Sequence, residues 1–261
     1  MPPIETSDWR TMPESARDTF LQDGYIVLPG FLSDGEVAEV RTNLDRFIAE
    51  VLPARPRELA FYEDLNKPES LKQIQQMHTH DPYFEGLFLK SKFEQLAEVL
   101  LDRPVDGINM QYFNKPPQVS TPTPPHQDGY YFMIEPCEAV TMWLALDDVD
   151  EENGCVRYVH GSNHCGLRPH VRTQTLGFSQ GITDFGTDAD MAGEVAHSAR
   201  PGDLLVHHAM TIHRADGNRS ESRHRRALGF IYYSQRAKVD EVAAAAYQER
   251  MAEEWKQAGK I

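Results

Sequence analysis

The feature that most constrains the fold is a change of residue pattern near Asn109. From there to Tyr233 the chain consists of short apolar runs separated by Pro, Gly, Asn and Asp. Short strands at this spacing, with turn-forming residues between them, are typical of a β-sandwich or β-barrel. The strands predicted from this pattern are Asn109–Phe113, Pro125–Phe132, Val140–Leu146, Val156–Val159, Leu204–His208 and Ala227–Tyr233.

The part of the chain before this change is predicted to be mainly helical, apart from a short strand at Tyr25–Leu28. Ser33 with Glu36, and Ser91 with Glu94, form capping boxes, in which a hydroxyl and a carboxylate satisfy free N–H groups at a helix start. Apolar residues recur at helical spacing behind both boxes, so one face of each helix is expected to pack on a core.

Two further stretches complete the expected organisation. The Gly- and Thr-rich residues Leu167–Val195 have weak periodicity and are predicted to form a long loop over a site. Val242–Trp255 is predicted to close the chain as a helix. A length of 261 residues suits one domain, and we expect a helical part over about 1–105, a strand-rich core over about 106–235 and a final helix over about 238–258.

Composition limits the partners and the compartment. The net charge of -14 argues against nucleic acid or an anionic membrane as the main partner, although a locally basic pocket could still hold a small acid. Three cysteines without a C-x-x-C pair favour a reducing compartment. The sequence shows no signal peptide, no apolar run near the roughly 18 residues of a membrane span and no peroxisomal C-terminal address. We therefore expect a cytoplasmic protein, either a monomer or a homodimer.

His126 and Asp128 form the first candidate metal-binding pair. In an extended strand, residues i and i+2 face the same side about 6–7 Å apart, so both side chains could reach one ion. The pattern has little specificity alone, because 11 His and this acidic content should produce it about once or twice by chance. The alternative is a half-buried histidine beside a solvated aspartate.

His213 is the candidate third ligand. It follows the predicted strand Leu204–His208 and would complete a face of two histidines and one carboxylate, which leaves coordination positions free for a co-substrate and O2. His207 and His208 are competing choices. Both lie inside the strand, where a histidine is more often hydrogen-bonded than bound to a metal.

A run of arginines before the last predicted strand offers a candidate carboxylate-binding residue. Arg225 shares a strand face with the small residues Ala227 and Gly229, whereas Arg226 shares the other face with Leu228. Small neighbours beside an inward arginine would leave room for a small dicarboxylate, which arginine can bind with two parallel hydrogen bonds.

Together these motifs resemble the phytanoyl-CoA dioxygenase-like branch of the iron(II)- and 2-oxoglutarate-dependent oxygenases. The resemblance begins near Tyr25 and keeps the same order to Arg226, so it covers most of the chain. A single His-x-Asp is unspecific, but the ordered set is highly specific. It is strongest over Asn114-Lys-Pro-Pro, His126-Gln-Asp-Gly-Tyr-Tyr-Phe, Trp143-Leu-Ala-Leu-Asp-Asp, Glu152-Asn-Gly-Cys, His160-Gly-Ser-Asn-His and Gly202-Asp-Leu-Leu through Arg226-Ala.

The resemblance implies a mainly β fold with flanking helices, whose core is a double-stranded β-helix, also called a jelly roll, as in cupins. His126, Asp128 and His213 match the iron ligands of the family. Arg225 resembles the arginine that binds the C5 carboxylate of 2-oxoglutarate. An extra residue between His213 and Arg225 leaves Arg226 as an alternative.

Three more residues are implied in co-substrate binding. Gln111 stands where relatives contact 2-oxoglutarate, and Trp143 matches an aromatic near that pocket, although it could equally be a core aromatic. Lys72 is the nearest counterpart of a lysine that binds the C1 carboxylate in some relatives. His160 departs from the family, which often has proline there.

The implied activity uses Fe(II), 2-oxoglutarate and O2 to hydroxylate an aliphatic C–H of a small-molecule or acyl-CoA substrate, with release of succinate and CO2. Asp128 favours hydroxylation, because related halogenases have a small residue at that position. The alternatives are a jelly-roll metal enzyme that does not use 2-oxoglutarate, and a catalytically silent binding module on the same fold.

Overall fold

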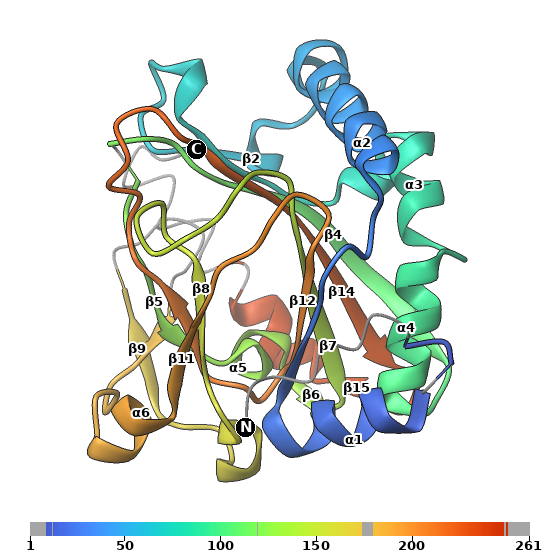
Figure 1. The fold of residues 1–261 in the computed structure, drawn as a ribbon, viewed down its shortest axis with the longest axis vertical. Helices are drawn as coiled ribbons and strands as arrows, with labels where there is room; N and C mark the ends of the chain where they lie inside the picture. Colours follow the sequence, from blue (N-terminus) through green and yellow to red (C-terminus); the bar gives the residue numbers. More distant parts are fainter. Residues whose placement is uncertain (1–8, 12, 119, 174–179, 248, 250–261) are drawn as a thin grey trace.

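The computed structural model describes residues 9–11, 13–118, 120–173, 180–247 and 249. A larger and a smaller antiparallel sheet face each other, with helices along the outer face of the larger sheet (Figure 1). This arrangement confirms the predicted jelly roll with flanking helices. The larger sheet has the strand order β1 (Tyr25–Leu28), β12 (Leu204–His208), β7 (Ala139–Ala145), β14 (Arg225–Ser234), β4 (Val105–Lys115), β3 (Leu71–Ile74) and β2 (Ala60–Tyr62). The smaller sheet has the strand order β11 (Glu194–His197), β8 (Val156–Val159), β13 (His213–Ala215) and β5 (Thr123–His126).

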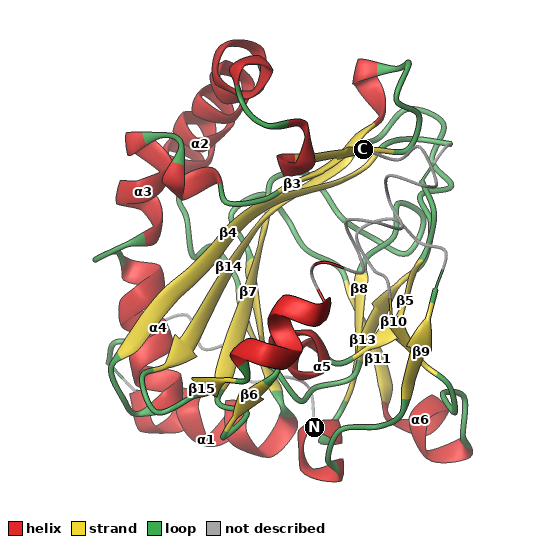
Figure 2. Cartoon of the chain, turned by 180° about the vertical axis from the view of Figure 1, so that it is seen from behind, coloured by secondary structure: helices red, strands yellow, loops and turns green. Residues whose placement is uncertain are grey.

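The remaining elements lie around these two sheets (Figure 2). Two short antiparallel pairs join β9 (His170–Arg172) to β10 (Gln180–Ile182) and β6 (Ile134–Glu135) to β15 (Lys238–Val239). The helices are α1 (Pro13–Asp23), α2 (Asp34–Arg46), α3 (Pro82–Phe88), α4 (Lys92–Leu101), α5 (Asp128–Phe132) and α6 (Asp188–Gly193). Among the described residues, none of these helices has the length and apolar character needed to cross a membrane.

Strand alternation separates the two largest of the four hydrophobic clusters among the described residues. In β7, Met142 and Leu144 belong to the core between the larger sheet and the helices, whereas Trp143 and Ala145 belong to the core between the two sheets. Successive side chains of a strand point to opposite faces, so the strands β1, β12, β7, β14 and β4 contribute to both cores, whereas β2 and β3 contribute to the core on the helix side. The functional residues that the larger sheet contributes, such as Trp143, lie on its face toward the smaller sheet.

The two predicted helix starts differ in detail. Ser33 and Glu36 form a complete capping box at α2, as predicted. Ser91 caps α4 through the backbone N–H groups of Phe93 and Glu94, but the Glu94 carboxylate accepts from the N–H of Lys90. The box at α4 is therefore only half formed.

Two sequence predictions of strands need correction. The strand predicted at Pro125–Phe132 ends at His126, and α5 begins at Asp128. Strands β2 and β3 were missed in the part predicted to be helical, because each has at most four residues and little alternation. The strands predicted at Tyr25–Leu28, Val156–Val159 and Leu204–His208 match the structure residue for residue.

The predicted loop Leu167–Val195 is also partly wrong. It contains β9, β10 and α6, and it includes the start of β11. No described residue of this stretch lines the pocket presented below, and residues 174–179 lie outside the described part of the chain. Of the predicted final helix, residues 241–247 are helical, while most of the rest lies outside the described residues.

Candidate metal and co-substrate site

Three side chains converge between the two sheets to form a possible metal site. His126 ends β5 and is paired directly with His213, the first residue of the neighbouring strand β13. Gln127 remains extended, with φ -122° and ψ 127°, before α5 begins at Asp128. His126, Asp128 and His213 each offer one ligand atom, and the three atoms lie within 4.8 Å of one another.

Backbone contacts orient both imidazoles. Nδ1 of His126 lies 2.8 Å from the carbonyl oxygen of Pro124, and Nδ1 of His213 lies 3.0 Å from that of Thr211. A carbonyl only accepts, so each Nδ1 must carry a hydrogen, and in a neutral imidazole this leaves the lone pair on Nε2. The two Nε2 atoms lie 3.5 and 3.7 Å from Oδ1 of Asp128.

The protonation states also suit a cation. Burial opposes the charge on Asp128, but His213, His126 and His207 hold the pKa of its carboxyl well below the usual range. Burial, together with His126 and His207, holds the pKa of His213 well below its usual value. The cluster therefore presents a carboxylate and neutral imidazole at neutral pH, which are the forms that bind metal ions.

The second oxygen of Asp128 is held by residues that the sequence analysis did not assign. Oδ2 accepts from Oγ1 of Thr141 at 2.6 Å and from Nε2 of His207 at 3.1 Å. Nδ1 of His207 accepts in turn from the hydroxyl of Tyr158 at 3.0 Å. Asp128 thus has one oxygen toward the two other ligands and one fixed by neighbours. Alternation in β7 could have indicated Thr141, which shares a face with Trp143.

The two competing histidines have different surroundings. His207 is buried beside the cluster and contacts the Asp128 carboxylate, as just described. The side chain of His208 instead lies against α1, with its ring centroid 5.8 Å from that of Phe20. Among the described residues, the grouping that could hold a metal ion contains neither of them.

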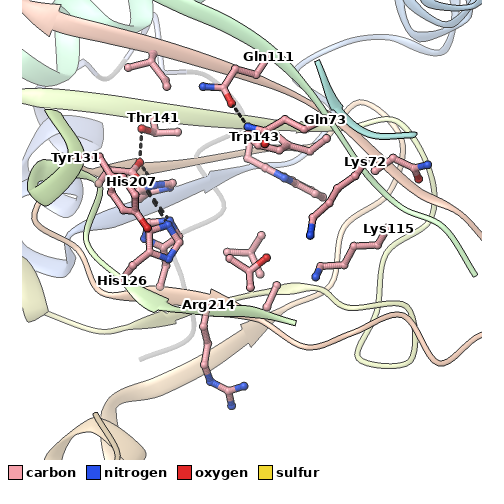
Figure 3. A pocket seen from close by; sticks show the side chains of 18 of the residues that line it. Lys72, Gln73, Gln111, Lys115, His126, Tyr131, Thr141, Trp143, His207 and Arg214 are labelled. Carbon is pink, nitrogen blue, oxygen red and sulfur yellow. Dashed lines mark hydrogen bonds and ion pairs between the residues drawn. The ribbon is translucent and has the colours of Figure 1, made fainter. Parts of the chain in front are cut away.

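One pocket joins this cluster to a group of cations at its other end. Its lining includes His126, Asp128 and His213, and also Lys72 and Arg225. Figure 3 shows His126 and His207 at one end, Lys72 and Lys115 reaching toward the other end, and Trp143 on the wall between them.

Arg225 and Arg226 lie on opposite faces of β14. Arg225 is 5% exposed and lines the pocket. Its Nε has no hydrogen-bond partner among the described residues. Its Cζ lies 5.3 Å from the ring centroid of Trp143. Burial lowers the pKa of Arg225 to about 10. Arg226 instead binds Asp147 from the other face, with Nη2 2.8 Å from Oδ1. Arg225 is therefore the arginine that faces the pocket.

Gly229, on the same strand face as Arg225, is needed for a reason different from the one predicted. Gly229 was expected to leave free space for a dicarboxylate. A Cβ at Gly229 would lie 2.6 Å from the ring of Phe113 on the neighbouring strand β4. The space beside Gly229 is filled by this ring, so the glycine allows sheet packing and not ligand binding.

The other implied co-substrate residues also line the pocket. Gln111 is buried and accepts from Nε2 of Gln73 at 2.7 Å. Lys72 pairs with Glu63 at 3.1 Å and donates to Oγ1 of Thr121 at 2.9 Å. Figure 3 places Lys72 away from His126. Lys72 lines the same pocket as the cluster, and the role implied for it in binding the C1 carboxylate stays a prediction.

Comparison with known proteins assigns the chain to a family. The family model described as phytanoyl-CoA dioxygenase (PhyH) matches residues 20–227, which is more than half of the chain. The chain belongs to this phytanoyl-CoA dioxygenase family. A similar protein is phytanoyl-CoA dioxygenase domain-containing protein 1 of Mus musculus, 25% identical over 244 residues that cover 77% of this chain and 84% of the relative. Phytanoyl-CoA dioxygenase of Arabidopsis thaliana is 26% identical over 249 residues, and the match covers 82% of this chain and 87% of the relative.

Solved structures of similar proteins share the fold. The epimerase SnoN in complex with Fe3+, alpha ketoglutarate and nogalamycin RO is 25% identical, with a TM-score of 0.69 over 88% of this chain and 86% of SnoN. EctD from S. alaskensis with 2-oxoglutarate and 5-hydroxyectoine is 20% identical, with a TM-score of 0.72. The match covers 92% of this chain and 83% of EctD. Family membership and the cluster together make the chain an iron(II)- and 2-oxoglutarate-dependent dioxygenase.

Proposed function

We propose that His126, Asp128 and His213 hold Fe(II), that Arg225 binds the C5 carboxylate of 2-oxoglutarate, and that the enzyme hydroxylates an aliphatic C–H of a small-molecule or acyl-CoA substrate. One observation carries this proposal. A single pocket has three converging ligand atoms at one end and a buried guanidinium without a carboxylate partner among the described residues at the other.

The donor set fits the proposed metal. Two imidazoles and one carboxylate on one face, with the remaining positions open, are typical of Fe(II) sites in oxygenases. Bound iron with 2-oxoglutarate and O2 supplies the oxidising chemistry, and the protein supplies binding, orientation and exclusion of water. Succinate and CO2 leave as the co-products.

The residues of this chain position the two reactants. Arg225 is fixed by burial and by the ring of Trp143, so its guanidinium is prepared for a carboxylate before binding. Gln111 lies on the pocket wall as a further polar contact. Phe132 and Ile231 add an apolar part to the lining, which suits an aliphatic portion of the substrate next to the cluster.

The relatives support a small substrate without defining it. SnoN was solved with nogalamycin RO and EctD with 5-hydroxyectoine, and the family is named for an acyl-CoA thioester. From these relatives we carry over only the substrate class to this chain, which is a small organic molecule with an unactivated C–H.

The proposal is tested by succinate formation across a library of small metabolites and acyl-CoA thioesters, with Fe(II), 2-oxoglutarate and O2 present. We expect succinate in stoichiometric amount with a hydroxylated product for at least one compound, and none after removal of iron with a chelator. Product formation that consumes no 2-oxoglutarate would contradict the proposal and favour a jelly-roll metal enzyme of another class.

The contacts to the second oxygen of Asp128 should determine how well the site holds its metal. Thr141→Val and His207→Phe each remove one hydrogen bond to Oδ2 while keeping the side chain about the same size. Loss of such an outer contact typically lowers metal affinity about 10- to 100-fold. We expect this weakening of Fe(II) binding in an equilibrium titration.

Thr183→Val is the matched control for this prediction. The Thr183 hydroxyl bonds to the carbonyl of Pro169, outside the pocket, and the side chain is exposed. Unchanged iron affinity in both Thr141→Val and His207→Phe would show that the orientation of Asp128 does not depend on these contacts.

A further inference from the structure

Lys115 stands directly opposite Arg225 in the larger sheet. The two residues are Cα partners in the pairing of β4 with β14. They are 3% and 5% exposed and line the same pocket. Side chains directly opposite each other on one sheet face have their Cβ atoms about 4.5–5.5 Å apart. The fold thus places two buried cations side by side.

Among the described residues, four lysine and arginine side chains line the pocket, and two of them have carboxylate partners. Lys72 pairs with Glu63 at 3.1 Å, and Arg214 pairs with Glu194 at 2.5 Å and Asp216 at 2.7 Å. Figure 3 shows Arg214 pointing away from the pocket.

Lys115 and Arg225 differ from these two cations. Within the described part of the chain, neither has a carboxylate oxygen within 4.0 Å. Nζ of Lys115 donates to the carbonyl oxygen of Thr121 at 2.7 Å. An ammonium carries three N–H groups, so this contact leaves it with capacity to bind an anion.

Two adjacent buried cations are costly without an anion. Like charges directly opposite on a sheet repel each other, and a buried charge must be paired or hydrogen-bonded. Burial, together with Arg225 and Lys72, holds the pKa of Lys115 well below its usual value. A carboxylate between the two side chains would remove this repulsion and stabilise both charges.

The geometry points to Lys115 as a second cation for the C5 carboxylate of 2-oxoglutarate, acting together with Arg225 as a specificity-determining residue for the co-substrate. This inference rests on the proposed function, and it adds a residue that the sequence analysis did not assign. A carboxylate has two oxygens, so the guanidinium and the ammonium can both bind it. The pair selects for a keto acid with a second acidic group.

The test compares two keto acids that differ in the far carboxylate. Their dissociation constants are measured anaerobically with Fe(II), following the visible band of the keto-acid complex. 2-Oxoglutarate has the second carboxylate, and 2-oxobutanoate lacks it. Lys115→Gln removes the charge but keeps an N–H donor for the Thr121 carbonyl, so a purely structural role of Lys115 would be largely preserved.

Lys115→Gln should weaken 2-oxoglutarate binding about 10- to 100-fold, as expected for loss of a hydrogen bond between two charged groups. It should change 2-oxobutanoate binding less than about threefold. Lys67→Gln is the control, because Lys67 is exposed and pairs with Asp64 outside the pocket. In the double variant with Arg225→Gln and Lys115→Gln, the dissociation constant of 2-oxoglutarate should rise by less than the product of the two single increases. The effects are not independent, since both residues bind one group.

Unchanged 2-oxoglutarate affinity in Lys115→Gln, or equal weakening of both keto acids, would overturn the role of Lys115. Either result would leave the proposed function intact. Absence of the band from the wild-type protein with 2-oxoglutarate would instead overturn the proposed function itself. Because 2-oxobutanoate binding is measured in each variant, it also shows that the variant is folded.

Discussion

Replacing His213 with alanine should remove bound iron and abolish turnover. The variant loses one of three ligand atoms that lie within 4.8 Å of one another. A bound metal contributes several kcal/mol to catalysis, so we expect turnover to fall at least about 1,000-fold. The measurements are iron content after anaerobic loading and the rate of succinate formation.

His208→Ala is the discriminating control for His213→Ala. His208 is a neighbour of the site in sequence, but its ring packs near Phe20 on the helix side of the sheet. The variant should bind iron as the wild type does, although it can lose some stability. If His213→Ala kept iron and activity while His208→Ala lost both, the assignment of ligands would be wrong.

Replacing Arg225 with alanine should raise the Michaelis constant for 2-oxoglutarate steeply while iron binding survives. Removing the partner of a buried carboxylate costs about 2–5 kcal/mol, which corresponds to roughly 30-fold to several-thousand-fold in affinity. Steady-state kinetics with varied 2-oxoglutarate, together with the iron content of the variant, measure both parts of this prediction.

Arg226→Ala separates the two neighbouring arginines. Arg226 lies on the outer face of β14 and binds Asp147 with Nη2 2.8 Å from Oδ1. Its loss should lower the free energy of unfolding by about 1 kcal/mol and change the Michaelis constant less than about threefold. The opposite pattern of Michaelis constants would mean that Arg226 enters the pocket and that β14 faces the other way.

Strand alternation explains why much of the core could be predicted from the sequence. The pattern after Arg225 places small residues on one face and large apolar residues on the other, and the structure assigns these faces to the two cores. Short strands with weak alternation, such as β2, could not be recognised because a run of three residues carries almost no periodicity. The helix α5 was read as a strand, because Tyr130, Tyr131 and Phe132 are residues enriched in strands.

The metal cluster could be predicted because its residues stand in an ordered series of motifs. The residues that orient it could not be, since their contacts depend on which strands become neighbours. Thr141 lies on β7 and His207 on β12, far apart in sequence, and both reach the same oxygen of Asp128. Lys115 was overlooked for the same reason, since its relation to Arg225 appears only when β4 pairs with β14.

The most direct test of the central claim is an anaerobic absorption spectrum of the protein with Fe(II), before and after addition of 2-oxoglutarate. Chelation of the iron by the keto acid at His126, Asp128 and His213 should give a weak visible charge-transfer band in the wild-type protein. The band should be absent from His213→Ala and should need much more 2-oxoglutarate in Arg225→Ala. A wild-type protein that binds Fe(II) but shows no band at saturating 2-oxoglutarate would contradict the account.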